Sequence, residues 1–258
     1  MLASGEDAAD LATRAADRGA TVLGMAGGDG SLAAIAAIAH ERDLPFVCIP
    51  FGTRNHFAGD AGLDDDDPIG ALPAFSGHER RVDIGAVGER FFLNNVSLGL
   101  YASFVHDPSR QTRNRILALA RMAPAALGRS RTPLELSFDI EGRRETSSAL
   151  IVLVANNGYE LESMAELGER QSLDSGLLHA YVIEAGTRRA LLALLAHAAV
   201  GRATSAESFV ERTASTFRLE ASRPSVHAAI DGEPVVLDSP LDFEIRPRGL
   251  RLLLPAEA

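Results

Sequence analysis

The segment GGDGS, residues 27–31, has the composition of a phosphate-binding turn. It follows the apolar run TVLGMA and precedes an apolar pattern typical of a helix. Glycines let such a turn approach a ligand without a Cβ in the way, and the first amides of a helix attract an anion. A turn that only packs a strand against a helix would also need glycines, so the motif alone leaves both interpretations open. If it binds phosphate, the contacts come from Gly27, Gly28, Gly30 and Ser31.

Asp29 lies in the middle of this turn, and its presence indicates a nucleotide that binds together with a metal ion. A carboxylate inside a phosphate site would repel the ligand unless a divalent cation lay between them. We therefore expect Asp29 to interact with Mg²⁺ held by the nucleotide.

A second glycine-bearing turn, PFGTRNHF at residues 50–57, also follows an apolar run. Open α/β sheets bind ligands at the carboxyl ends of their strands. Thr53, Arg54 and Asn55 would present a hydroxyl, a guanidinium and an amide there. The two turns together predict a nucleotide site more specifically than either turn does alone.

The pattern around these turns alternates between helix and strand up to about residue 82, which predicts an α/β layer with parallel strands. From residue 83 onward, short β-type runs separated by Gly, Asp and Pro predict an all-β sandwich-like domain. Two helical insertions are expected in this second half, at about 108–128 and at 187–201 with the adjoining segment AESFVERTA, residues 206–214. We therefore expect two domains, residues 1–82 and 83–258.

The composition excludes several classes of protein. A net charge of −10 argues against a nucleic-acid partner. All 25 basic residues are arginine, which excludes mechanisms that need a lysine. No uncharged apolar run approaches the roughly 20 residues that cross a bilayer, and the acidic N-terminus is no secretory signal. We interpret the single cysteine, Cys48, as a residue packed in the core. A chain without disulfides suits a reducing compartment, so we expect a cytoplasmic protein.

Five segments in order, GGDGSL, PFGTRNHFA, VDIG, NNVSLGLYA and IDGEP, resemble the diacylglycerol kinase catalytic-domain family of bacterial lipid kinases, which is related to sphingosine kinases. The resemblance extends over nearly the whole chain. It implies an α/β nucleotide-binding domain and a β-sandwich domain, with nucleotide and lipid meeting in the cleft between them. It also implies ATP and Mg²⁺ as cofactors and a diacylglycerol-like lipid at the membrane surface as substrate. A position on the inner membrane face and a homodimer are both left open.

The resemblance also implies roles for individual residues. The GGDG turn and Ser31 contact the ATP phosphates, and Thr53 and Asn55 lie beside the nucleotide. Asp231 or Glu233 accepts the proton of the lipid hydroxyl, although VHAAIDGEPVV taken alone is simply a hairpin with a tight Asp-Gly turn. If both residues have strand geometry, they point to the same side, so that one is the base and the other supports it.

The chain departs from the family pattern at three places. Family members usually begin with a further strand, loop and helix, so we expect a nucleotide-binding domain that is incomplete at its N-terminus and an impaired activity. His56 stands where the family usually has an aspartate, and a neutral imidazole cannot supply that charge. The segment LDSGLL, residues 173–178, resembles the family's structural Mg²⁺ loop through Ser175 and Leu177. Ser175 replaces an aspartate there, and hard cations prefer carboxylates, which weakens this expectation.

Residues 108–134 contain six arginines and no acidic residue. Such a segment could lie on anionic lipid and bring the cleft to its substrate. A surface helix with solvated arginines would explain the same composition equally well.

Three functions therefore remain. The first is an ATP-dependent lipid kinase, in which Asp29, Asp231 and Glu233 are catalytic. The second is a noncatalytic nucleotide or lipid sensor, suggested by the lost acidic residues. The third is a kinase for a soluble substrate, because NAD kinases and phosphofructokinases also carry GGDG turns. The PFGTRNHFA turn and the long β half favour the lipid kinase.

Overall fold

The computed structural model describes residues 7–53, 55–99, 133–140, 142–160, 170–184, 193 and 208–256. The expected insertion at 108–128 lies outside these ranges, as does the one at 187–201 apart from residue 193. The helix expected in the adjoining AESFVERTA is wrong, because residues 209–214 form a strand that pairs antiparallel with residues 178–183. Arg54 and residues 108–132 of the arginine-rich segment also lie outside them.

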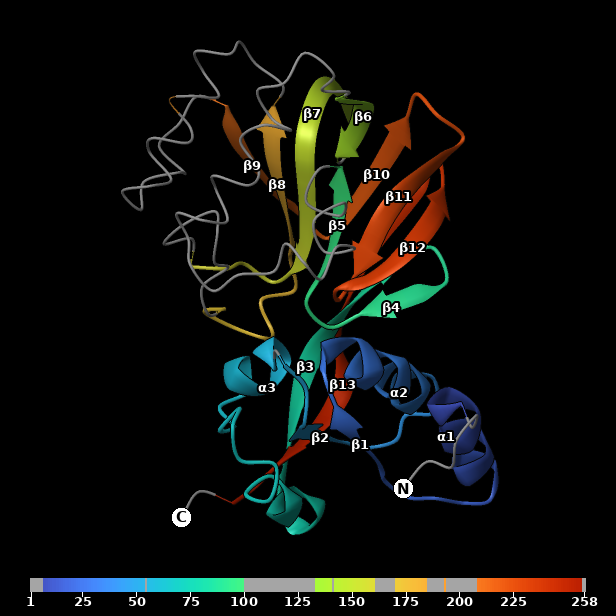
Figure 1. Ribbon diagram of the computed structural model, residues 1–258, viewed down its shortest axis with the longest axis vertical. Helices are drawn as coiled ribbons and strands as arrows, with labels where there is room; N and C mark the ends of the chain where they lie inside the picture. The colour runs from blue at the N-terminus through green and yellow to red at the C-terminus, as the bar shows by residue number, and fades with distance from the viewer. Residues whose placement is uncertain are drawn as a thin grey trace.

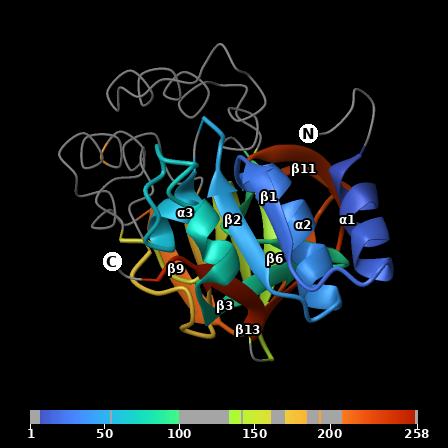
Figure 2. The same ribbon diagram turned by 90° about the horizontal axis from the view of Figure 1, so that it is seen from below.

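The N-terminal part of the chain forms a small α/β layer, drawn at the bottom of Figure 1. Its strands β1 and β2 pair in parallel with Leu23 opposite Phe46, and the end of the last strand of the chain, β13, lies parallel to β2 on its other side. Figure 2 shows this layer from below, with α1 and α2 close to one another. Its elements are α1 (Ala8–Asp17), β1 (Leu23–Gly27), α2 (Asp29–Glu41), β2 (Phe46–Pro50), α3 (His56–Asp60) and the 3₁₀ helix η1 (Leu72–Ser76).

The rest of the described chain is β structure with antiparallel pairing. Strands follow one another in the order β10-β6-β7-β5-β11-β12, and β8 and β9 extend from β7. The predicted fold, an α/β domain followed by a sandwich-like β domain, is confirmed. The strands are β3 (His78–Val87), β4 (Arg90–Phe92), β5 (Asn95–Gly99), β6 (Leu134–Ile140), β7 (Arg143–Asn156), β8 (Leu178–Glu184), β9 (Phe209–Ala214), β10 (Thr216–Ala221), β11 (Ser225–Ile230), β12 (Glu233–Asp238) and β13 (Leu241–Leu254).

Two long paired strands, β3 and β13, join the halves of the molecule (Figure 1). At one end, Val87 and Phe243 are buried in the core of the β domain. At the other end, Ile84 and Leu252 are buried in the core beneath α2. Residue 83 therefore falls inside β3, and the C-terminal end of β13 is part of the N-terminal layer. Strands β3 and β13 belong to both layers. The domain boundary expected between residues 82 and 83 therefore stays a prediction.

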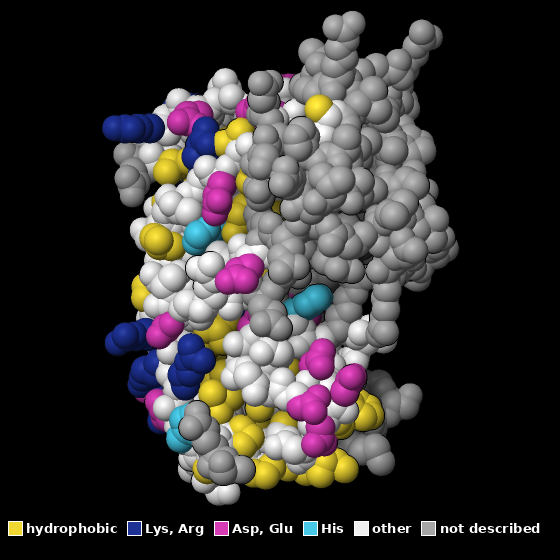
Figure 3. All heavy atoms as spheres, turned by 90° about the vertical axis from the view of Figure 1, so that its left-hand side faces the viewer, with side chains coloured by type: hydrophobic (Ala, Val, Ile, Leu, Met, Phe, Trp, Pro, Cys, Tyr) yellow, Lys and Arg dark blue, Asp and Glu magenta, His cyan; other side chains and the backbone are white. Residues whose placement is uncertain are grey.

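The acidic run at residues 64–67 is exposed. Its turns are closed by side chains, since Asp64 accepts a hydrogen bond from the Asp66 amide and Asp67 accepts one from the Gly70 amide. Figure 3 shows acidic side chains gathered low on one face of the molecule. This distribution agrees with the negative net charge of the chain.

Candidate phosphotransfer site

The two glycine-bearing turns predicted from the sequence contact each other directly. The Phe51 amide donates a hydrogen bond to the Gly27 carbonyl at 3.1 Å. Gly52 lies so close to Gly28 that a Cβ added to Gly52 would be 2.4 Å from the Gly28 Cα. The absence of side chains at these positions therefore allows the two turns to form one continuous surface.

Helix α2 begins at Asp29, two residues before the expected start near Ser31. Its N-cap is Gly28, which has no side chain to cap the first amides. The first hydrogen bond from within the helix is made by the Leu32 amide, to the Gly28 carbonyl. The amides of Asp29, Gly30 and Ser31 thus belong to the first turn, where a helix can bind an anion.

Asp29 is buried and ties the first turn to helix α3. Its carboxylate accepts hydrogen bonds from the His56 amide at 3.3 Å and from the Phe57 amide at 3.2 Å. Burial raises the pKa of Asp29, while the Phe57 amide and the nearby His56 side chain act in the opposite direction. Asp29 therefore caps α3, a role that the sequence motif did not reveal.

Asn55 uses its side chain to shape the second turn. Its Oδ1 accepts from the Gly52 amide at 2.9 Å, and its Nδ2 donates to the Asp65 carbonyl at 2.8 Å. Thr53 is exposed in the same turn. The predicted contacts of Thr53 and Asn55 with a nucleotide remain predictions, and Asn55 also has a structural role.

The segment IDGEP forms the tight turn between β11 and β12. Asp231 has φ 46° and Gly232 has φ 85°, both in the left-handed region that a type I′ hairpin turn requires. Ile230 pairs with Glu233 across this turn. The condition that residues 231 and 233 both have strand geometry is therefore not met, because Asp231 lies in the turn and Glu233 begins β12.

The Asp231 carboxylate is buried beneath the turn that joins β4 to β5. It accepts three backbone hydrogen bonds, from Leu93 at 2.7 Å, Asn94 at 2.8 Å and Asn95 at 3.0 Å. Burial raises the pKa of Asp231 to about 7 although these three amides oppose the rise, and the negative charge of Asp29 adds to it. The two aspartates, which are 202 positions apart in the chain, thus interact electrostatically across the domain junction.

Glu233 brings the hairpin into contact with the first turn of α2. A Cβ added to Gly30 would be 2.4 Å from the Glu233 Cγ and 2.9 Å from its Oε1. Glu233 itself is exposed. The three predicted catalytic residues, Asp29, Asp231 and Glu233, are therefore gathered at one junction between the α/β layer and the β domain.

Comparison with known families agrees with this architecture. Residues 2–87 match the model of the diacylglycerol kinase catalytic domain, and residues 96–254 match that of the YegS C-terminal NAD kinase beta sandwich-like domain. The chain belongs to the diacylglycerol kinase catalytic-domain family. The resemblance noted in the sequence is thereby confirmed.

Individual relatives match over nearly the whole of this chain. A Pseudomonas fluorescens protein named "Probable lipid kinase YegS-like" is 30% identical over 98% of this chain and 83% of its own length. A protein of the same name from Pseudomonas aeruginosa is 29% identical over 97% of this chain and 82% of its own. The crystal structure of a "putative diacylglycerol kinase" from Bacillus anthracis superposes with a TM-score of 0.74 at 17% identity, covering 96% of this chain and 83% of that one. At that identity the superposition shows the fold alone.

The structural Mg²⁺ loop of the diacylglycerol kinase family is a poor fit to the residues found here. The Ser175 hydroxyl donates to the Asn157 Oδ1, and the Leu177 carbonyl accepts from the Asn157 amide. The Asp83 carboxylate accepts from the amides of Gly176 and Arg248, both at 2.7 Å. Across the described ranges, no group of three or more His, Cys, Asp or Glu side chains could hold a metal ion. The expected cation at Ser175 and Leu177 stays a prediction, and protein hydrogen bonds already use these oxygens.

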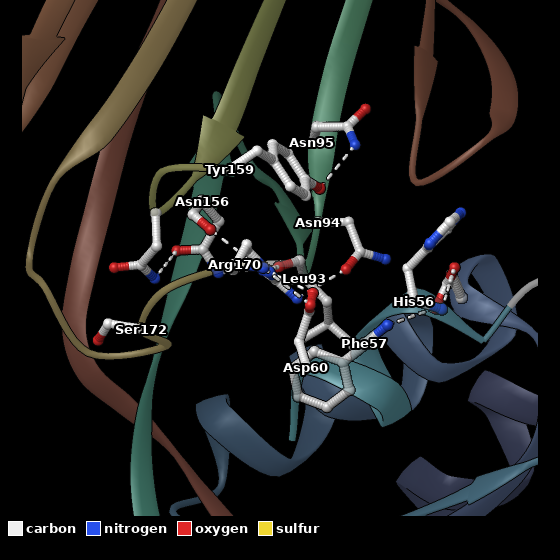
Figure 4. A network of polar contacts seen from close by, with 12 residues as sticks. His56, Phe57, Asp60, Leu93, Asn94, Asn95, Asn156, Tyr159, Arg170 and Ser172 are labelled. Atoms are coloured by element: carbon white, nitrogen blue, oxygen red, sulfur yellow. Dashed lines mark hydrogen bonds and ion pairs between the residues drawn. The ribbon is translucent and has the colours of Figure 1, made fainter. Parts of the chain in front are cut away.

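Arg170 is a member of the site that the sequence did not indicate. Its side chain is completely buried, and its Nε donates to the Asp60 Oδ2 at 2.6 Å in a buried ion pair. It also donates to the carbonyls of Leu93 and Asn156 and to the side chain of Asn94 (Figure 4). Arg170 lies in GERQS, which resembles no binding motif, so only the contacts reveal it.

No helix in the described part of the chain is long and apolar enough to cross a membrane.

Proposed function

We propose that this chain is an ATP-dependent lipid kinase that transfers the γ-phosphoryl group of ATP to the hydroxyl of a diacylglycerol-like lipid. Membership of the diacylglycerol kinase catalytic-domain family supports a kinase, and the names of the relatives support a lipid acceptor. The observation that carries the proposal is the contact of Glu233 with Gly30, because it places the acidic hairpin against the candidate phosphate turn.

On the nucleotide side, the chain offers backbone amides rather than cationic side chains. The amides of Gly30 and Ser31 in the first turn of α2 would bind phosphate oxygens, with the positive end of the helix dipole behind them. The sequence contains no lysine that could serve instead. These amides suit a ligand that approaches the backbone closely.

Mg²⁺ would be held chiefly by the nucleotide, with Asp29 as the protein group nearest to the phosphate turn. The chemistry of the site supports this role of Asp29. A buried carboxylate beside a phosphate-binding turn would repel the phosphate unless a cation lay between them. When bound, the ion neutralises charge on the phosphates during transfer. The carboxylate oxygens of Asp29 each accept one amide hydrogen bond and keep a further lone pair for this purpose.

On the acceptor side, Asp231 is the base. An alcohol is a weak nucleophile, and a base with a pKa near the working pH activates it most effectively. The proton of the lipid hydroxyl moves to the Asp231 carboxylate as the hydroxyl oxygen bonds to the γ-phosphorus. The bond from that phosphorus to the bridging oxygen breaks, and ADP leaves. Glu233, between the hairpin and Gly30, orients the acceptor against the phosphate turn.

A phosphoryl-transfer assay tests the proposal. The protein is incubated with γ-labelled ATP, Mg²⁺ and mixed vesicles containing diacylglycerol or a sphingoid base, and in parallel with the soluble acceptors NAD and fructose 6-phosphate. We expect labelled lipid. The variant Asp231→Asn should reduce turnover by at least about 100-fold, which is the low end of the contribution of a general base.

Asp238→Asn is the matched control, because Asp238 ends strand β12 at the far end of the same hairpin and is exposed. It should retain full turnover. Label found only in a soluble acceptor would replace the lipid kinase by a soluble-substrate kinase. ATP binding without transfer to any acceptor would favour the sensor.

A further inference from the structure

We infer that Arg170 is a positioning residue of the phosphotransfer site. It orients the Asn94 side chain and the backbone of residues 93–95, which lie between Asp29 and Asp231. The inference rests on the proposed function for its catalytic consequence. Arg170 itself contacts neither the Asp29 nor the Asp231 carboxylate.

The first step is the orientation of the Asn94 side chain. Arg170 Nη2 donates to the Asn94 Oδ1 at 2.9 Å. Because a guanidinium has only donors, it can face only the oxygen of this amide, so the Asn94 Nδ2 must point the other way. Figure 4 shows this nitrogen directed away from Arg170 and toward the side of the site where His56 lies.

The second step is the contact that this orientation permits. The Asn94 side chain acts as a hydrogen-bond donor that lowers the pKa of Asp29, against the larger effect of burial, which raises it. An Asn94 amide turned by 180° would present its oxygen to the Asp29 carboxylate and repel it. Arg170 thus determines that Asn94 presents its NH₂ group, and not its oxygen, to Asp29.

The third step concerns the backbone that holds Asp231. Arg170 Nη1 donates to the Leu93 carbonyl at 2.6 Å and to the Asn156 carbonyl at 3.1 Å. These bonds fix the peptide that follows Leu93. The amides of Leu93 and Asn94 on either side of that carbonyl both donate to Asp231.

The fourth step is the anchoring of Arg170 itself. Asp60 at the end of α3 receives two of its hydrogen bonds, from the backbone amide at 3.0 Å and from Nε at 2.6 Å. The guanidinium also lies over the rings of Phe57 and Tyr159, at 5.9 and 5.8 Å from their centroids. Asp29 caps the first turn of the same helix α3. Arg170 therefore connects the C-terminal end of α3 to Leu93 and Asn94.

Arg170→Lys separates positioning from charge. A lysine ammonium can pair with Asp60, so that no buried carboxylate is left without a counter-ion. It cannot also reproduce the planar fork that reaches Leu93, Asn156 and Asn94 together. A second variant, Asn94→Asp, still accepts from Arg170 but has no NH₂ group to present to Asp29.

Each variant is compared with two controls. Arg251→Lys replaces an arginine that binds Glu79 with two nitrogens on the outside of β13. Val226→Ala removes buried methyl groups in the β domain and so controls for lost stability. The measurements are Tm, ATP affinity by titration calorimetry, kcat and KM for ATP, and the side-chain NH₂ signal of Asn94 in a ¹H–¹⁵N correlation spectrum.

We expect Arg170→Lys and Asn94→Asp to lower kcat by about 10- to 100-fold with a small change in KM for ATP, which is typical of a displaced catalytic group. Neither control should do so. Arg170→Lys should also shift the Asn94 side-chain signal, which Val226→Ala should leave in place.

An unchanged kcat together with an unchanged Asn94 signal in Arg170→Lys would overturn the inference. An equal loss of kcat in Val226→Ala, at the same Tm as Arg170→Lys, would also overturn it. Wild-type protein without transfer activity would overturn the proposed function alone. In that case the Asn94 signal in Arg170→Lys still decides whether Arg170 orients residues 93 and 94.

Discussion

At the scale of single residues, the site depends on carboxylates kept away from water. Asp231 accepts three amides and is still a weaker acid than an ordinary aspartate, because the loss of solvation outweighs the hydrogen bonds. Asp29 shares this situation and lies near enough for the two charges to oppose each other. Under the proposed function, this arrangement suits Asp231 to act as a base near neutral pH.

The pKa of Asp231 predicts opposite effects of pH on activity and on stability. Only the carboxylate form accepts a proton, so kcat/KM should rise with pH and level off above an apparent pKa of about 7. In an unfolded chain the pKa of aspartate is about 3.9, so folding takes up a proton between these two values. The contribution of Asp231 to stability is therefore complete below about pH 4 and is lost as the pH rises through about 7.

These trends can be measured by initial rates and by Tm from pH 5 to pH 9, with Asp238→Asn as a control for general effects of charge. A pH–rate profile that is flat through pH 7 would contradict Asp231 as the base.

Gly30→Ala tests the contact between the halves of the site. The added Cβ would lie 2.4 Å from the Glu233 Cγ, so the Glu233 side chain must move. Because this side chain is flexible and alanine favours a helix by up to about 1 kcal/mol over glycine, stability should change little. We expect kcat/KM to fall by about tenfold or more.

Gly59→Ala is the matched control for Gly30→Ala, since it adds the same methyl group in α3, where a Cβ would meet nothing within 4 Å. Steady-state kinetics distinguish the two. Equal kinetics for both variants would show that the Glu233 contact is irrelevant to turnover.

At the scale of elements, Asp83 joins three segments that are far apart in the sequence. One carboxylate oxygen accepts from Gly176 in the loop before β8, and the other accepts from Arg248. Arg248 has φ 53° and lies at the bulge of β13, where the pairing with β3 shifts. Asp83 thereby fixes both the loop and the bend of the strand that connects the two layers.

Asp83→Asn should lower the free energy of unfolding by about 2–3 kcal/mol, because one charge-assisted hydrogen bond is lost and an amide NH₂ would face a backbone donor. Asp139→Asn is the control, since Asp139 also accepts from a backbone amide, that of Gly142, but in an exposed turn. Urea unfolding followed by circular dichroism measures both. Similar losses in the two variants would show that burial of Asp83 contributes nothing.

At the scale of the whole molecule, an acidic protein must reach a lipid surface that is itself anionic if the proposed function holds. The arginine-rich segment at 108–134 is the candidate for this contact, and residues 108–132 lie outside the described ranges. Its role in membrane binding stays a prediction from the sequence, as do the predicted homodimer and the position on the inner membrane face.

Replacement of Arg113, Arg115 and Arg121 by glutamine should weaken binding to anionic vesicles by about 1 kcal/mol per arginine. The control replaces Arg218, Arg223 and Arg246, which are exposed on the β domain, and so changes the net charge equally. Co-sedimentation with vesicles that contain phosphatidylglycerol measures both. The same binding after both replacements would refute the docking role of the segment.

The amino-acid sequence alone was enough to predict an α/β layer followed by β structure and to indicate the family. The glycines at 27, 28, 30 and 52 indicated turns where backbones approach closely, because only glycine allows such contacts. The change from helical to alternating patterns predicted an α/β layer followed by β structure, since these periods follow from local geometry. The resemblance of IDGEP to the family motif also indicated Asp231 and Glu233, although the Asp-Gly turn that gives Asp231 its positive φ excluded strand geometry there.

The contacts among the site residues became apparent only in the folded chain. Arg170 lies in no motif, and its function depends on contacts with Asp60, Leu93, Asn94 and Asn156 that no local pattern encodes. The capping of α3 by Asp29 and the pKa of Asp231 likewise depend on which groups surround each carboxylate after folding. Burial and long-range hydrogen bonds are properties of the packed chain, so the chemistry of this site follows from the way β3 and β13 bring the two layers together.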